Sequence, residues 1–231
     1  MTPKAASRPT KRAAAPTPEP EPPLEPPAET PAVLARSRWG ADFDPDRLAL
    51  LELRMWKAYY RRQPARLFGT LVLGLREQAH VHWPRALIAA VFLTKGAVGF
   101  ARATGDYDRF APDVARGYRW LGLPGDVDIE AVAREELRWW VVRREIGLAA
   151  GSAAGATIAR LYAALYNVPL ASVAEAGRLR GIASEIRDRG ASTDPDGPMG
   201  RGDSYWPEVG RYLAESYRNL HTVLRVSSDQ P

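Results

Sequence analysis

Cysteine is absent from the whole chain of 231 residues, which excludes disulfide bonds, thiolate metal ligands and a cysteine nucleophile. A chain without cysteine is compatible with a reducing compartment. No apolar stretch resembles the core of a signal peptide, and none later in the chain reaches the roughly 20 residues that a membrane span needs. We therefore expect a cytoplasmic protein that does not associate with a membrane.

Lysine is also scarce, because 28 of the 32 basic residues are arginine. Arginine suits bidentate pairing with carboxylates and phosphates and stacking on aromatic rings. The net charge is +5 and the sequence pI is about 9.6, but the chain also carries 27 acidic residues. No strong positive field follows from this balance, so we do not expect nucleic acid as a partner.

Residues 1–38 differ in composition from the remainder of the chain. They contain no aromatic residue, and ten of the 20 prolines lie within residues 1–31. Such a segment cannot bury enough apolar surface to fold. We expect a disordered Pro/Ala/Glu-rich arm, kept extended by its prolines, in front of a single domain over residues 39–231. The arm is either a tether that binds a protein partner or a dispensable solubilising tail.

The body of the chain shows the pattern of helices joined by short, proline-marked connections. Asp44 followed by Pro45 is a helix start, Pro64 begins a second helix, and Asp128 is the N-cap of the longest stretch without proline. No segment shows the alternation that is typical of strands. The sequence therefore predicts an all-α bundle of six or seven helices.

The stretch without proline covers residues 128–166 and has glycine at every fourth position over Gly147, Gly151 and Gly155. This spacing predicts a groove in which a second helix backbone approaches closely. Three glycines also weaken a helix by about 1 kcal/mol each relative to alanine. A kink or break near Ala150 is therefore an alternative to one long helix.

Charged residues stand in the middle of otherwise apolar helix faces. Glu52 interrupts the apolar face of the first helix of the body. Glu136 and Arg143 interrupt the apolar face of the long stretch without proline. A charge that faces a core must be paired and hydrogen-bonded, or it costs several kcal/mol. We expect these three residues to meet inside the bundle, either as a sealed ion pair or around a polar pocket.

Further residues near these charges are candidates for ligand binding. Lys95 is a lone charge in an apolar helix over residues 85–103, and is either a snorkelling side chain or the counter-charge of an interior carboxylate. Tyr59 is expected on the buried face of the first helix of the body. The candidate ligand-binding residues are Arg143, Lys95, Trp139, Trp140 and Tyr59.

Two motifs are too incomplete to carry a function. Glu77 and His80 match one Glu-x-x-His element of carboxylate-bridged di-metal bundles, but the chain has no second element. We therefore expect no metal and no other cofactor. The join around Asn167 loosely follows a helix-turn-helix, but acidic residues accompany the arginines of the helix that follows it.

Three classes of function fit these features. The first is a soluble α-helical domain with a charged interior and a proline-rich tether, which binds a small anionic ligand or a protein partner. The second is an enzyme acting on an anionic substrate, with Glu52 or Glu136 as acid or base and Arg143 or Lys95 as the anion clamp. The third, which has the least support, is a DNA-binding protein of the helix-turn-helix type.

Overall fold

The computed structural model describes residues 42–147, 151–193 and 203–228, which form eight α-helices and two short 3-10 helices with no strand among them. The α-helices are α2 (Pro45–Tyr60), α3 (Pro64–Ala79), α4 (Trp83–Arg102), α5 (Ala111–Leu121), α6 (Ile129–Ile146), α7 (Gly151–Tyr166), α8 (Leu170–Thr193) and α9 (Trp206–Ser228), and the 3-10 helices are η1 (Tyr107–Phe110) and η3 (Asp203–Tyr205). The all-α class is confirmed, but the expected number of helices is too low. The expected disordered arm lies outside the described residues.

The additional helix arises because the stretch over residues 128–166 is divided at Gly147. α6 ends at Ile146, and Gly147 follows with a φ of +61°, a conformation that glycine adopts more readily than residues with a side chain. α7 begins at Gly151. The prediction of a break in this region is therefore confirmed, and the alternative of one continuous helix is wrong.

Local sequence sets the other helix boundaries largely as expected. Asp44 caps α2 by accepting hydrogen bonds from the backbone N–H groups of Asp46 (2.9 Å) and Arg47 (3.1 Å). Asp128 caps α6 by accepting a hydrogen bond from the N–H of Ala131 (3.0 Å). Left-handed residues reverse the chain after α2, α3 and α7, and these are Arg62, His80 and Asn167. Such short turns make consecutive helices neighbours.

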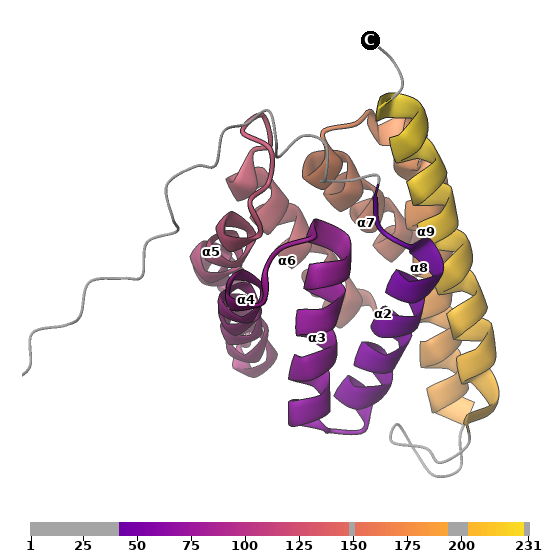
Figure 1. Cartoon of the computed structure of the whole chain (residues 1–231). Coiled ribbons are helices and arrows are strands. Elements are labelled where there is room, and N and C mark those ends of the chain that lie inside the picture. Colours follow the sequence, from indigo (N-terminus) through magenta and orange to yellow (C-terminus); the bar gives the residue numbers. More distant parts are fainter. Residues whose placement is uncertain (1–41, 148–150, 194–202, 229–231) are drawn as a thin grey trace, which may run out of the picture.

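The helices form a closed ring in which each one packs mainly against the helices before and after it in the chain. The ring closes because α9 packs against α2, and the two lie side by side in Figure 1. Apolar side chains from all around the ring form one core, whose most deeply buried members include Phe43, Val114, Val132, Ile158 and Leu213. Helices on opposite sides of the ring are consequently joined by side chains that reach across it.

A close backbone approach joins α7 to α8. A Cβ atom on Gly177 would lie only 2.6 Å from the carbonyl oxygen of Gly155 and 2.7 Å from the Cβ of Ala159. The expected glycine groove is therefore present at Gly155. Because this contact lies two or more turns away from the reversal at Asn167, α7 and α8 run side by side as an antiparallel hairpin. A helix-turn-helix instead crosses its helices at about 90–120°, so this pair departs from that motif.

The outer face of α4 is uncovered and largely apolar, with Lys95 and Arg102 as its exposed charges. Among the described residues, α4 is the one helix that is long and apolar enough to cross a membrane by length and composition, with a mean hydropathy of 1.3. The expectation that no apolar run reaches this length is therefore wrong. Only 28% of the apolar window is buried, and its exposed large residues are Trp83, Leu87, Val91 and Val98.

We expect Gly177→Ala to destabilise the protein by about 1–3 kcal/mol, because the added methyl group would meet the backbone of α7. Gly74→Ala is the matched control, because Gly74 also lies inside a helix but a Cβ atom added there would have no neighbour within 4 Å. The control should stabilise the protein by about 0.5–1 kcal/mol through its higher helix propensity. Urea unfolding measures both changes, and equal effects at the two positions would contradict the close approach.

Candidate functional site

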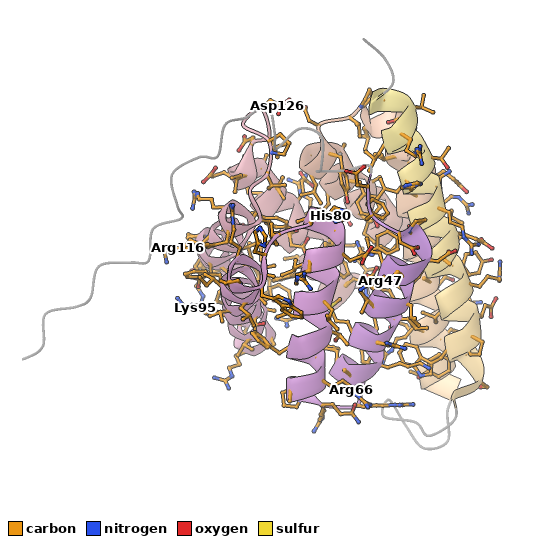
Figure 2. The ribbon with its side chains drawn as sticks, in the orientation of Figure 1. Arg47, Arg66, His80, Lys95, Arg116 and Asp126 are labelled. Carbon is orange, nitrogen blue, oxygen red and sulfur yellow. The ribbon has the colours of Figure 1, made fainter. Side chains whose placement is uncertain are left out.

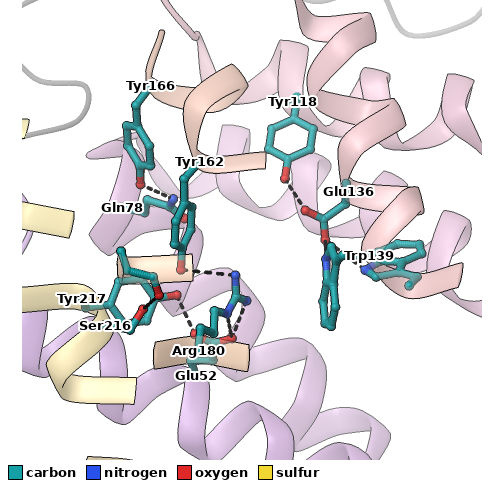
Figure 3. Close-up of polar contacts among 12 residues, drawn as sticks. Glu52, Gln78, Tyr118, Glu136, Trp139, Tyr162, Tyr166, Arg180, Ser216 and Tyr217 are labelled. Carbon is teal, nitrogen blue, oxygen red and sulfur yellow. Dashed lines mark hydrogen bonds and ion pairs between the residues drawn. The ribbon is translucent and has the colours of Figure 1, made fainter. Parts of the chain in front are cut away.

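Polar side chains from several helices meet in the interior of the ring, in the groups drawn in Figure 3. The first group is centred on Glu52 of α2, whose side chain is only 3% exposed. Arg180 of α8 donates to its Oε1 through Nε (2.9 Å) and through Nη2, and Tyr217 of α9 donates to its Oε2 (2.6 Å). Both oxygens of this carboxylate are therefore used, and its charge is paired.

Arg180 belongs to this first group and also lies near a second group, which is centred on Glu136 of α6. Its guanidinium carbon is 5.5 Å from the ring centre of Trp139 and 5.8 Å from that of Tyr162. Burial acts to lower the pKa of Arg180, but the charge of Glu52 and the neighbouring tyrosines outweigh it, so the pKa stands well above its ordinary value. Burial and the same carboxylate hold the pKa of Tyr217 well above its ordinary value. Tyr217 therefore remains a hydrogen-bond donor, and Arg180 remains charged.

Glu136 of α6 is the centre of the second group and has partners of a different kind. Its carboxylate accepts hydrogen bonds from the hydroxyl of Tyr118 (2.9 Å) and from the indole N–H groups of Trp139 (3.2 Å) and Trp140 (3.0 Å). Burial raises the pKa of Glu136, although Arg180 and the three donors act to lower it. The side chain is half-buried. Glu136 thus takes up a proton more readily than an ordinary glutamate.

Arg143 belongs to neither group, so its expected meeting with the two glutamates is wrong. It donates to Oδ1 of Asp188 on α8 (2.9 Å) and to the hydroxyl of Tyr60 on α2 (3.3 Å). Arg187 donates to the same oxygen of Asp188 (2.9 Å). The cause is geometric: Arg143 lies two turns beyond Glu136, about 10 Å along the axis of α6, and so reaches a different level of the ring.

Two of the expected ligand-binding residues lie on the surface. The side chain of Lys95 is 63% exposed and pairs with Asp113 on α5 (3.0 Å), so it is not the counter-charge of an interior carboxylate. Figure 2 shows Lys95 at the edge of the molecule. Tyr59 lies in the last turn of α2 and is 57% exposed, so its expected burial is wrong.

Sequence reasoning missed the partners of the interior charges. Arg180 follows Val173 and Ala176 and precedes Ala183 at spacings of three and four residues, and these three apolar residues are fully buried. That spacing marks a position facing the core, so the sequence held a signal for Arg180. Asp188 has no comparable signal, because its role depends on how α8 meets α6.

Metal ligands do not gather in the described part of the chain, where no group of three or more His, Cys, Asp or Glu side chains could hold an ion. Glu77 of the Glu-x-x-His element instead pairs with Arg47 (2.9 Å) and accepts a hydrogen bond from the backbone N–H of Asp44 (3.1 Å). His80 is exposed beyond the end of α3. These contacts give the glutamate a structural role at the start of α2.

An open groove of about 600 Å³ lies between α8 and α9 on the outside of the ring. Its charged lining residues are paired: Arg178 contacts Glu175 (2.6 Å) and Arg211 contacts Glu215 (2.8 Å) within their own helices, and Arg218 contacts Asp46 of α2 (2.7 Å). Exposed pairs of this kind contribute little to stability and leave little net charge to attract a ligand. The interior groups are therefore the better candidate site.

We expect Glu52→Gln to destabilise the protein by about 3–5 kcal/mol, because it leaves the buried charge of Arg180 without its counter-ion. Arg180→Met should have a similar cost for the opposite reason. The double variant should cost at least about 1 kcal/mol less than the sum of the single changes, because it leaves neither charge unpaired. Urea unfolding of the four proteins measures this coupling, and additive costs would show that the pair does not exist.

Glu136→Gln should change how the stability of the protein depends on pH, because the pKa of Glu136 is raised in the folded protein. The unfolded chain ionises near its ordinary value, so the wild type loses stability as pH rises from about 4.3 through the folded pKa. The variant lacks this loss, and its stability relative to wild type should therefore increase with pH in that window.

Glu175→Gln is the control for this measurement, because hydrogen bonds from Arg178 lower the pKa of Glu175. The stability of Glu175→Gln relative to wild type should therefore decrease as pH rises. The change should be small, because both side chains are exposed. Unfolding in urea between pH 3 and pH 8 provides the comparison. A stability of Glu136→Gln that falls with pH relative to wild type would contradict the raised pKa.

Comparison of the chain with protein-family models, with curated proteins and with solved structures gives no match. The fold and the contacts of the described residues are consequently the basis on which a function is proposed.

Proposed function

We propose that this protein is an interaction module that binds a helical protein partner through the outer face of α4. The observation that carries the proposal is the exposure of this helix: its apolar window has the hydropathy of a membrane span, yet only 28% of it is buried. Large exposed apolar patches on a protein surface mark sites of interaction with proteins or membranes.

The spacing of the exposed residues favours a helix as the partner. The outer face of α4 carries Pro84, Leu87, Val91, Thr94, Val98 and Ala101, of which Thr94 is half-buried and the others are exposed. We call this set the α4 stripe. Its intervals of three and four residues follow the heptad pattern of coiled coils, in which Pro84, Val91 and Val98 hold one core position and Leu87, Thr94 and Ala101 hold the other. Valine at the first position together with Leu87 at the second favours two-stranded pairing, so the simplest occupant is α4 of a second copy.

The inner face of α4 supports docking over insertion into a membrane. Ala86, Ala89 and Ala90 are fully buried against the neighbouring helices. Arg85 also donates from Nε to the carbonyl oxygen of Trp120 at the end of α5 (3.0 Å). A spanning helix would have to leave these contacts, whereas a partner helix uses only the α4 stripe.

The interior groups give less support to the alternative of an enzyme acting on an anionic substrate. Glu52 has both oxygens engaged by Arg180 and Tyr217, and Lys95 lies on the outside. Glu136 is the acid that remains, and its raised pKa suits a proton donor, but it is held by three neighbouring donors. In the proposed module these groups fix the ring, and residues 1–38 remain a proposed tether for a further protein partner.

We expect the wild-type protein to form a dimer at micromolar concentration, and Leu87→Glu/Val91→Glu to weaken the dimer by at least about 100-fold. Each such residue at the centre of an interface contributes on the order of 2 kcal/mol, and every substitution occurs twice in a symmetric dimer. Analytical ultracentrifugation over a concentration series measures the dissociation constant.

Val226→Glu is the matched control, because Val226 of α9 is also exposed (58%) but lies outside the α4 stripe. This variant should dimerise as the wild type does. A wild type that is monomeric at all concentrations would refute pairing with a second copy. Flotation of the wild type, but not of the double variant, with anionic vesicles would show that lipid occupies the α4 stripe instead.

A further inference from the structure

A set of buried charges at the level of Arg143 is not balanced. Arg143 of α6 and Arg187 of α8 both donate to Oδ1 of Asp188, each over 2.9 Å. Their side chains are 16% and 10% exposed, and that of Asp188 is 11% exposed. Two guanidinium groups thus share one carboxylate oxygen, and among the described residues this leaves one positive charge in a largely desolvated place.

Comparison with Arg180 in the same protein shows what Arg187 lacks. Arg180 engages Glu52 through two of its nitrogens. Arg187 uses Nη1 for Asp188, while its Nε is buried and has no hydrogen-bond partner in the described part of the chain. Its guanidinium carbon lies 3.1 Å from the ring centre of Tyr60. A buried, charged donor without an acceptor is strongly unfavourable, so Arg187 adds to the local demand for a further negative charge.

We propose that Arg143, Arg187, Asp188 and Tyr60, together called the anion cluster, bind the carboxylate or phosphate group of a small ligand. The planar guanidinium presents pairs of donors that match the oxygens of either group. The oxyanion accepts from the guanidinium of Arg143, whose side chain keeps the largest exposed fraction, and it neutralises the surplus charge that Arg187 contributes. The hydroxyl of Tyr60, which accepts from Arg143 at 3.3 Å, directs its own proton toward the same anion.

The anion cluster lies near the end of the ring where α2 terminates. Arg143 retains the largest exposed fraction of the three charged side chains, and Tyr60 is in the last turn of α2. The ring of Tyr59, which is 57% exposed, lies edge-on to that of Tyr60 with 5.0 Å between their centres. A ligand anchored by its oxyanion would therefore place the remainder of its body against Tyr59. This site is separate from the α4 stripe and does not depend on it.

Isothermal titration calorimetry with inorganic phosphate, and separately with acetate, tests the proposal at constant ionic strength set by chloride. We expect saturable binding of at least one of these probes to the wild-type protein. Arg187→Met should weaken it by about 10- to 100-fold, because it removes the surplus positive charge that the anion neutralises. Asp188→Asn should tighten it by about tenfold, because the anion no longer competes with an internal carboxylate.

Arg178→Gln is the control, because Arg178 lies on the open outer groove and pairs with Glu175 in its own helix. It should bind the probes as the wild type does. Circular dichroism checks that each variant is folded, and Arg143→Lys, which keeps the charge but loses the fork, replaces Arg187→Met if that variant unfolds. Tighter binding by Asp188→Asn is a result that a purely structural role of the cluster would not produce.

The relative affinity for acetate and phosphate identifies which oxyanion the ligand carries. Heats equal to those of added chloride would overturn the proposal. Equal affinity for wild type, Arg143→Lys and Arg187→Met would also overturn it, because binding would then occur elsewhere. Weaker binding by Asp188→Asn would contradict the competition on which the site depends.

Discussion

The ion pair between Glu52 and Arg180 is the contact on which the arrangement of the ring depends. Each helix packs mainly on its neighbours in the chain, so few backbone contacts fix one side of the ring relative to the other. Glu52 and Arg180 are 128 residues apart in sequence and join α2 to α8, while Tyr217 adds α9 to the same carboxylate. A buried ion pair is directional in a way that apolar contacts are not, because either charge alone is strongly unfavourable. This pair therefore adds a directional contact to the packing of α9 on α2 that closes the ring.

The interior charges are equal in number but unequal in distribution. The side chains concerned are the carboxylates of Glu52, Glu136 and Asp188 and the guanidinium groups of Arg143, Arg180 and Arg187. At the level of Glu52 two carboxylates accompany one arginine, and the raised pKa of Glu136 reduces the surplus negative charge there. At the level of Asp188 two arginines accompany one carboxylate, and an arginine cannot lose its proton to compensate. Protonation can relieve the first imbalance, whereas only an added anion can relieve the second.

The helices and the residues that face inward can be predicted from the sequence, but the pairs that these residues form cannot. Helix starts at Asp44 and Asp128 follow from local capping chemistry, and charges within an apolar face correctly marked Glu52 and Glu136 as interior. Their partners come from α8 and from aromatic residues. Which residues become partners depends on the closure of the ring and not on any local pattern. Tyr59 shows the same limit, because its place on the apolar face is real but the last turn of α2 leaves it exposed. Periodicity predicts the direction in which a side chain points, but it does not predict whether another part of the protein covers that side chain.

The distribution of side-chain size on α4 explains why its outer face is the apolar surface that a partner would cover. Four of its five buried positions are small, namely Ala86, Ala89, Ala90 and Gly96, which lets the neighbouring helices approach closely, and the fifth is Phe100. Several large apolar residues, among them Leu87 and Val91, lie on the exposed side of the helix. An ordinary surface helix has the reverse arrangement, with large apolar residues inside and polar residues outside. Burial of apolar area stabilises a protein by about 25 cal/mol per Å², and on α4 much of that area is still exposed to water. The same free energy is therefore available for association with a second helix, which the ring itself does not provide.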